Sequence, residues 1–336
     1  MPYLVCFLAS IMILLWAVVI NENMKINQIL LLIITVISNG GYYALANSTC
    51  LETAILANKL TYLLGIFSPM LIFFNICEIC KIRIKYLVVA GLYTVQMLLY
   101  MGVLTIGSSD LFYKTVQFHV GNYGGYLTKT YGPLHSLYLA MFILYLGMSL
   151  WVSVYSLNKK NGVSYKNADL LIFTGILIIG TYFIERVLHL RFEFVPITFT
   201  VGLFVILISV TKTKQYVVEE NSDIIAAKME GTAYIVFSRK LLYMGCNEYA
   251  AHLFPELLEW KVEKKIPGNG GRFNTFLRQT FMKFVESRQE RPMQGTPFTI
   301  KDRTFRYTVK HLYNRKRQIG YVIELIDVTE FTDAML

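Results

Sequence analysis

Long apolar runs dominate the first 211 residues and limit what this chain can fold into. Each run is close to the roughly 20 residues that a helix needs to cross a bilayer, and few charges interrupt it. Beyond Lys212 the composition is that of an ordinary soluble domain. The sequence therefore predicts a multi-domain membrane protein, in which a transmembrane α-helical bundle precedes a water-soluble domain.

We predict seven spans, because seven apolar runs of suitable length are separated by polar or basic loops. The first run has no basic segment and no small-residue cleavage site, which favours an uncleaved helix over a signal peptide. The predicted spans lie at roughly 3–20, 26–46, 52–77, 85–106, 133–157, 168–188 and 193–211.

Lysine and arginine in the short loops indicate the orientation, because these residues favour the cytoplasmic side. One side carries Lys25, Lys81, Arg83, Lys85, Lys159, Lys160, Lys166, Lys212 and Lys214. The opposite side holds only Lys114, Lys129 and Arg191. This bias predicts an outside N-terminus and a cytoplasmic C-terminal domain. The same bias and attraction to anionic membrane lipid account for the net charge of +10, so we expect no nucleic-acid partner.

Ionisable residues within or at the ends of the spans are the candidate ligand residues, since each is costly to bury in lipid. Lys59 lies about 10 Å below the outer end of the third span. Glu185, Arg186 and His189 close the sixth span at a similar depth. Two interpretations remain open. Lys59 faces Glu185 or Arg186 in an outward ligand pocket, or it forms a structural ion pair and reaches to the headgroups.

The outer loop from Gly107 to Pro133 is the longest and is rich in tyrosine and glycine. At this length it is either a functional loop or a small hairpin cap. Aromatic side chains with polar tips suit both a binding lid and an interfacial belt.

Three membrane functions can be compared. A retinal pigment needs a lysine within the last span, and none precedes Lys212 there. A transporter of small solutes needs paired broken helices and an internal repeat, whereas only the third span is interrupted, by Gly65 and Pro69. A receptor needs only an outer site and a rigid route to a cytoplasmic domain. The sequence favours the receptor and keeps transport as the weaker alternative.

The stretch "ANKLTYLLGIFSPMLIFF" resembles the third-helix signature of the seven-helix N-terminal sensor region of bacterial histidine kinases and diguanylate cyclases. The matching positions are Lys59, Leu60, Tyr62, Gly65, Phe67 and Pro69. "YGPLHSLYL" and "FEFVPITF" resemble the openings of that region's fifth and seventh helices. The resemblance implies a bacterial membrane sensor of an unidentified small ligand. It adds Tyr62 to the candidate ligand residues and supplies no catalytic residue.

The remaining residues divide into a helical connector (212–229), an α+β domain (230–330) and the start of an output connector (331–336). "NEYAAHLFPEL" and "GYVIELIDVTE" resemble the helix and the last strand of a PAS-like domain. The resemblance implies a homodimerising relay module whose signal exits at Asp327, Thr329 and Glu330.

Enzyme signatures are missing from the sequence. There is no ATP-binding segment, His311 lies in an expected strand, and no glycine pair continues into a cyclase motif. Cys77 and Cys80 lack the second Cys or His pair that a metal site needs. We therefore expect a sensor without catalytic residues, metal or cofactor, acting through a cytoplasmic kinase or cyclase partner. The alternative is the input half of a truncated kinase or cyclase.

Overall fold

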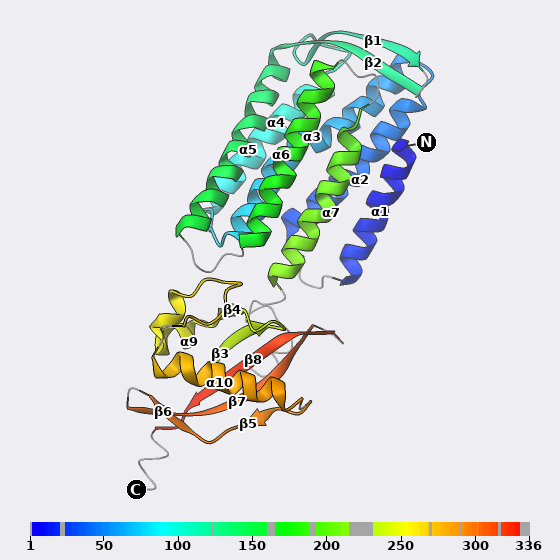
Figure 1. Ribbon diagram of the computed structural model, residues 1–336. Coiled ribbons are helices and arrows are strands. Elements are labelled where there is room, and N and C mark those ends of the chain that lie inside the picture. Colours follow the sequence, from blue (N-terminus) through cyan, green and yellow to red (C-terminus); the bar gives the residue numbers. More distant parts are fainter. Residues whose placement is uncertain are drawn as a thin grey trace. The chain divides into compact units, whose positions relative to one another are not determined.

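A computed structural model of the chain describes residues 2–20, 24–121, 124–159, 165–188, 193–214, 231–268, 271–288, 290–300, 302–314 and 317–329. The chain divides into two compact units (Figure 1). The first comprises Met1–Asn158 and Lys166–Val210, and the second comprises Lys159–Tyr165 and Thr211–Leu336.

The first unit is a bundle of long helices. Within the described residues they are α1 (Pro2–Ile20), α2 (Ile26–Ala46), α3 (Leu51–Ile79), α4 (Tyr86–Leu104), α5 (Pro133–Lys159), α6 (Tyr165–Val187) and α7 (Val195–Lys214). These bounds agree with the predicted runs to within a few residues. Helices α1–α5 are long and apolar enough to cross a membrane, and α7 adds the shorter apolar stretch Val195–Ile208. The unit is therefore a membrane helical region.

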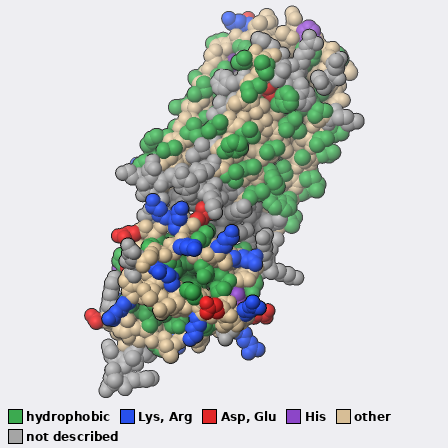
Figure 2. Space-filling view, viewed as in Figure 1, with side chains coloured by type: hydrophobic (Ala, Val, Ile, Leu, Met, Phe, Trp, Pro, Cys, Tyr) green, Lys and Arg blue, Asp and Glu red, His purple; other side chains and the backbone are tan. Residues whose placement is uncertain are grey.

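The surfaces of the two units differ in chemistry. Apolar side chains cover the visible face of the bundle, whereas lysine, arginine and acidic side chains gather on the second unit (Figure 2). Exposed apolar residues such as Met12, Leu98 and Trp151 lie on bundle helices, where hydrocarbon rather than water is the expected solvent.

Small residues allow α2 and α3 to pack closely. A Cβ atom added to Gly41 would lie 2.9 Å from Leu60 Cβ and 3.0 Å from the carbonyl oxygen of Ala57. Ser38 Oγ donates to the carbonyl oxygen of Thr61 at 2.7 Å, which links the two helices directly. Helices in lipid associate through such close contacts and interhelical hydrogen bonds, since apolar surface gains little by leaving lipid.

An antiparallel hairpin, β1 (Tyr113–Gly121) and β2 (Gly124–Tyr131), lies across one end of the bundle (Figure 1). We call this the hairpin end. Gly124 has φ +111°, and a Cβ atom there would lie 2.2 Å from the carbonyl oxygen of Ala46 at the end of α2. Leu127 packs against the buried ends of α2 and α3. Of the two alternatives for the longest predicted loop, the structure shows the hairpin cap. Its glycines allow the strands to lie directly against the ends of the helices.

The second unit is an antiparallel sheet with helices, as the α+β prediction requires. Its strands are β3 (Thr232–Ser238), β4 (Tyr243–Cys246), β5 (Met293–Gln294), β6 (Phe298–Ile300), β7 (Arg303–Asn314) and β8 (Arg317–Asp327). The strand order is β4-β3-β8-β7-β5, with β6 also paired to β7. Its helices are α9 (Glu248–Leu253), η1 (Pro255–Leu258) and α10 (Arg272–Glu286).

Helix α10 covers one face of this sheet with a stripe of apolar side chains. Phe273, Leu277, Phe281 and Phe284 follow the helical period and are each at most 1% exposed. The ring of Phe281 lies 4.5 Å from that of Phe237 on β3. This contact joins the helix to the central strands in one core.

Asn247 fixes the start of α9. Its Oδ1 accepts from the backbone N–H of Ala250 and of Tyr234, both at 3.0 Å. Its Nδ2 donates to the carbonyl oxygen of Thr232 at 2.9 Å. One side chain therefore caps the helix and ties it to β3. The predicted connector lies outside the described residues from position 215 onward.

Candidate functional site

A chain of polar side chains joins the hairpin to helix α3. Lys129 Nζ on β2 donates to Asn58 Oδ1 at 2.8 Å. Asn58 Nδ2 donates to Tyr113 Oη on β1 at 3.3 Å, and Tyr113 Oη donates to Tyr62 Oη at 2.7 Å. We call these four residues the hairpin-end network. It connects both strands of the hairpin to the first turns of α3.

Strand periodicity explains how a lysine from a surface loop reaches this network. Alternate residues of a strand share a face, so Lys129 lies on the same side of β2 as Leu127, which packs on the bundle. Asn58 is only 1% exposed and Tyr113 only 2%, and their polar atoms are satisfied within the network. The Lys129 ammonium also lies 5.6 Å from the centre of the Tyr113 ring, within cation–π range.

Aromatic rings surround the Tyr62 end of the network. Tyr62 meets Phe112 edge-on at 4.9 Å and Tyr138 at 5.7 Å between ring centroids. His135 is buried and stacks on Tyr131 at 3.8 Å. This packing fixes the orientation of the Tyr62 hydroxyl relative to the hairpin.

Lys129 carries a positive charge at neutral pH. Burial opposes the charged ammonium, but the influence of Tyr113 and Glu193 outweighs it, so the pKa of Lys129 lies above its usual value. Among the described residues, no carboxylate lies within ion-pair distance of this ammonium. The network therefore holds a cation with a neutral amide as its hydrogen-bond partner.

Among the described residues, Lys59 and Glu185 do not form an ion pair. The Glu185 carboxylate instead accepts from the backbone N–H of Phe194 and, at 2.8 Å, from that of Val195. The free N–H groups at the start of α7 are fixed donors, and a carboxylate there is also favoured by the helix dipole. Lys59 has no ion-pair partner in the described part of the chain, and its carbonyl oxygen accepts from Tyr100 Oη at 3.4 Å.

Two further candidates give less information. Arg186 belongs to α6, but its side chain is outside what the structure describes. His189 lies outside the described residues altogether. Tyr62 is the candidate that the structure places in a defined network.

Lys129, Asn58 and Tyr113 are the members that the sequence prediction missed. Lys129 was counted only as a loop charge, and the other two carry no signal of their own. The alternation of β2 was the available signal, since it puts Lys129 on the inward face with Leu127. The link to Asn58 joins residues 71 positions apart, which local patterns do not specify.

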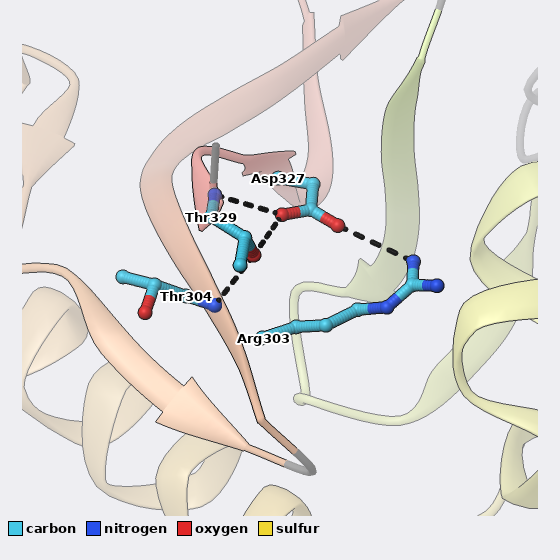
Figure 3. A network of polar contacts seen from close by, with 4 residues as sticks. All are labelled: Arg303, Thr304, Asp327 and Thr329. Carbon is cyan, nitrogen blue, oxygen red and sulfur yellow. Dashed lines mark hydrogen bonds and ion pairs between the residues drawn. The ribbon is translucent and has the colours of Figure 1, made fainter. Parts of the chain in front are cut away.

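A second polar network lies at the predicted signal exit (Figure 3). Asp327 Oδ1 accepts from the backbone N–H of Thr329 at 3.0 Å and from its hydroxyl. Thr329 Oγ1 accepts from the backbone N–H of Thr304 at 3.0 Å. Arg303 Nη1 donates to Asp327 Oδ2 at 3.3 Å. We call these four residues the exit network, and it fastens the end of β8 to the start of β7.

The exit network keeps Asp327 ionised. Partial burial raises the pKa of this carboxyl, but the hydrogen bonds from Thr329 and the charge of Arg303 outweigh burial and lower it below its usual value. Glu330, the third predicted exit residue, lies outside the described residues.

Aromatic side chains fill the core of the second unit. Phe254 and Phe273 stack at 4.0 Å, and Tyr243 meets Trp260 edge-on at 5.2 Å. No group of three His, Cys, Asp or Glu side chains that could hold a metal occurs among the residues described.

Comparison with known proteins assigns the helical bundle to a family. No curated protein matches the chain significantly. A family model described as the N-terminal 7TM region of histidine kinase matches residues 2–217. The match spans all the helices of the bundle, and it confirms the resemblance predicted from the third helix. The chain belongs to the family of N-terminal 7TM regions of histidine kinases.

Proposed function

We propose that this protein is a bacterial membrane sensor that detects a small ligand at the hairpin end and relays the signal to its α+β unit. The family assignment supports a sensor input region in the membrane. Seven spans with the hairpin end outside and the second unit in the cytoplasm follow from the positive-inside bias of the loops. The ligand residues are drawn from Tyr62 with its network and from the neighbouring candidates Lys59, Glu185, Arg186 and His189.

The hairpin-end network is the observation that carries this proposal. It attaches an exposed hairpin to α3. The whole of α3 has 29 residues, or about 43 Å, and runs towards the other end of the bundle. A continuous helix carries a displacement at its first turns towards its far end, and Pro69 within α3 is the point at which this helix can bend. A ligand that changes the bonding of Lys129 or Tyr62 therefore acts directly on a transmembrane element.

The second unit is proposed to be a PAS-like relay. Its antiparallel sheet, the apolar core between that sheet and α10, and the Asp327–Thr329 exit support this identity. We further propose that it forms a homodimer and passes the signal to a cytoplasmic kinase or cyclase. The exit network suits this role, because its hydrogen bonds connect the last strand directly to the segment that leaves the domain.

A coupling experiment tests the relay without a known ligand. Asn58→Ala removes the centre of the hairpin-end network, and hydrogen exchange of the Thr304 and Thr329 amides reports the exit network in the full chain in nanodiscs. We expect severalfold changes in both exchange rates, since coupled sites bias one another. Thr94→Ala is the control, because Thr94 is exposed on α4 and bonds only to Ala90 within its own helix. Exchange that changes only within the bundle contradicts the relay.

A further inference from the structure

The hairpin-end network has more donors than acceptors. The Lys129 ammonium has three N–H groups; Asn58 Oδ1 accepts from one at 2.8 Å and the Tyr113 side chain also interacts with the ammonium, which leaves at least one donor without an acceptor. At the other end, Tyr62 Oη accepts from Tyr113, and its own hydrogen has no acceptor among the described residues. The two ends of the network thus both lack an acceptor.

The network also lacks a compensating charge. Glu193 is the carboxylate whose field acts on Lys129, yet it does so from beyond ion-pair distance. Tyr113 and Glu193 already favour the charged ammonium, but no carboxylate oxygen of the described residues contacts it directly, and a hydrogen bond to an anionic oxygen is stronger than one to a neutral amide. Lys114 offers a comparison on the same hairpin, because it lies in β1 and its side chain is exposed.

We propose that the Lys129 ammonium, oriented by Asn58, binds an anionic oxygen group, namely a carboxylate or a phosphate. The group belongs either to a small solute or to the headgroup of an anionic lipid, and both present the same oxygen acceptors. Its role as the sensed signal rests on the proposed function, whereas the binding itself does not.

An anion can reach Lys129, and its binding there affects the rest of the hairpin-end network. Lys129 is half-buried, so part of its ammonium remains open to a bound group. An anion that draws the ammonium away from Asn58 Oδ1 loosens the bonds that continue through Tyr113 to Tyr62. Anion binding would thus act on the same links that hold the hairpin to α3.

Thermal unfolding of the full chain in phosphatidylcholine nanodiscs tests the proposal. Sodium propionate or inorganic phosphate is compared with sodium chloride at equal ionic strength, and a second arm adds phosphatidylglycerol to the nanodisc. We expect an oxyanion to raise the unfolding temperature by roughly 2–4 °C. A shift with propionate or phosphate identifies a solute site, and a shift with phosphatidylglycerol alone identifies a lipid site.

Three variants link the shift to the site. Lys129→Met abolishes it, and Lys114→Met keeps it. Asn58→Asp places a carboxylate beside Nζ within the protein itself, so it should abolish the response even if Lys129→Met fails to fold. The proposal is overturned if no oxyanion exceeds chloride in either arm, or if Asn58→Asp responds as the unmodified protein does. The thermal shift measures binding, whereas hydrogen exchange at Thr304 and Thr329 measures the proposed relay. Absence of the shift is therefore distinct from absence of the relay.

Discussion

Replacing Thr329 by valine tests the exit network with almost no change of shape. The substitution removes Oγ1, which accepts from the backbone N–H of Thr304 at 3.0 Å and donates to Asp327. The carbonyl oxygen of Thr304 accepts from the backbone N–H of Val328 at 2.8 Å. The Thr304 N–H thus donates to the Thr329 hydroxyl instead of to a backbone carbonyl oxygen of the segment that follows β8.

The structure sets the size of the expected effect. A typical hydrogen bond contributes about 1 kcal/mol net, and the partial exposure of this site lets water replace part of the loss. Removing the acceptor should therefore increase the exchange rate of the Thr304 amide by roughly two- to fivefold, which corresponds to about 0.4–1 kcal/mol.

Hydrogen exchange of the full chain in nanodiscs measures this directly. Thr299→Val is the matched control, because Thr299 lies opposite Thr304 on β6 and its exposed hydroxyl contacts only the Thr304 side chain. An unchanged Thr304 rate in Thr329→Val would refute the network. So would an equal increase in the control.

Three other expectations concern the pH response, a helix cap and helix packing. Because the pKa of Asp327 is lowered in the folded state, its contribution to stability is complete above about pH 4 and is lost as the pH falls through the folded pKa. Asp327→Asn should remove this acid-dependent loss in unfolding measured from pH 2 to 6. Glu185→Ala should speed exchange of the Val195 amide by about tenfold through loss of the cap, whereas an unchanged rate would exclude capping. Gly41→Val should destabilise the bundle by about 1–3 kcal/mol, because its side chain meets α3. Gly91→Val should have little effect on thermal unfolding, since nothing lies within 4 Å of a Cβ there.

The elements that the sequence predicted well are those with a local signal. A span is defined by one run of apolar residues, so its place can be read from composition alone. The structure joins Asp327 and Thr329, two positions apart, by a hydrogen bond, and the signal exit assigned to them from the PAS resemblance stays a prediction. The hairpin was left as one of two alternatives, because strand pairing depends on register as well as composition.

Local sequence patterns could not predict the polar partners of the candidate residues. A side-chain partner for Glu185 was one of the interpretations left open, and Glu185 bonds to backbone N–H groups, whose position the residue types do not indicate. The bond between Lys129 and Asn58 needs the hairpin register and the position of α3 together. Thr304 joined the exit network for the same reason, since its partner lies 25 residues away.

The orientation of the chain across the membrane tests the receptor account most directly, and two native cysteines report it. Cys50 is exposed at the hairpin end, and a hydrogen bond with the Thr53 hydroxyl lowers the pKa of its thiol, which favours the reactive thiolate. Cys246 lies in β4 of the second unit, while the other cysteines are buried: Cys6, Cys77 and Cys80. A membrane-impermeant maleimide applied to intact cells should label the protein through Cys50, and Cys50→Ser should abolish that labelling. Labelling of intact cells that survives Cys50→Ser and disappears in Cys246→Ser would contradict an outside sensor with a cytoplasmic relay.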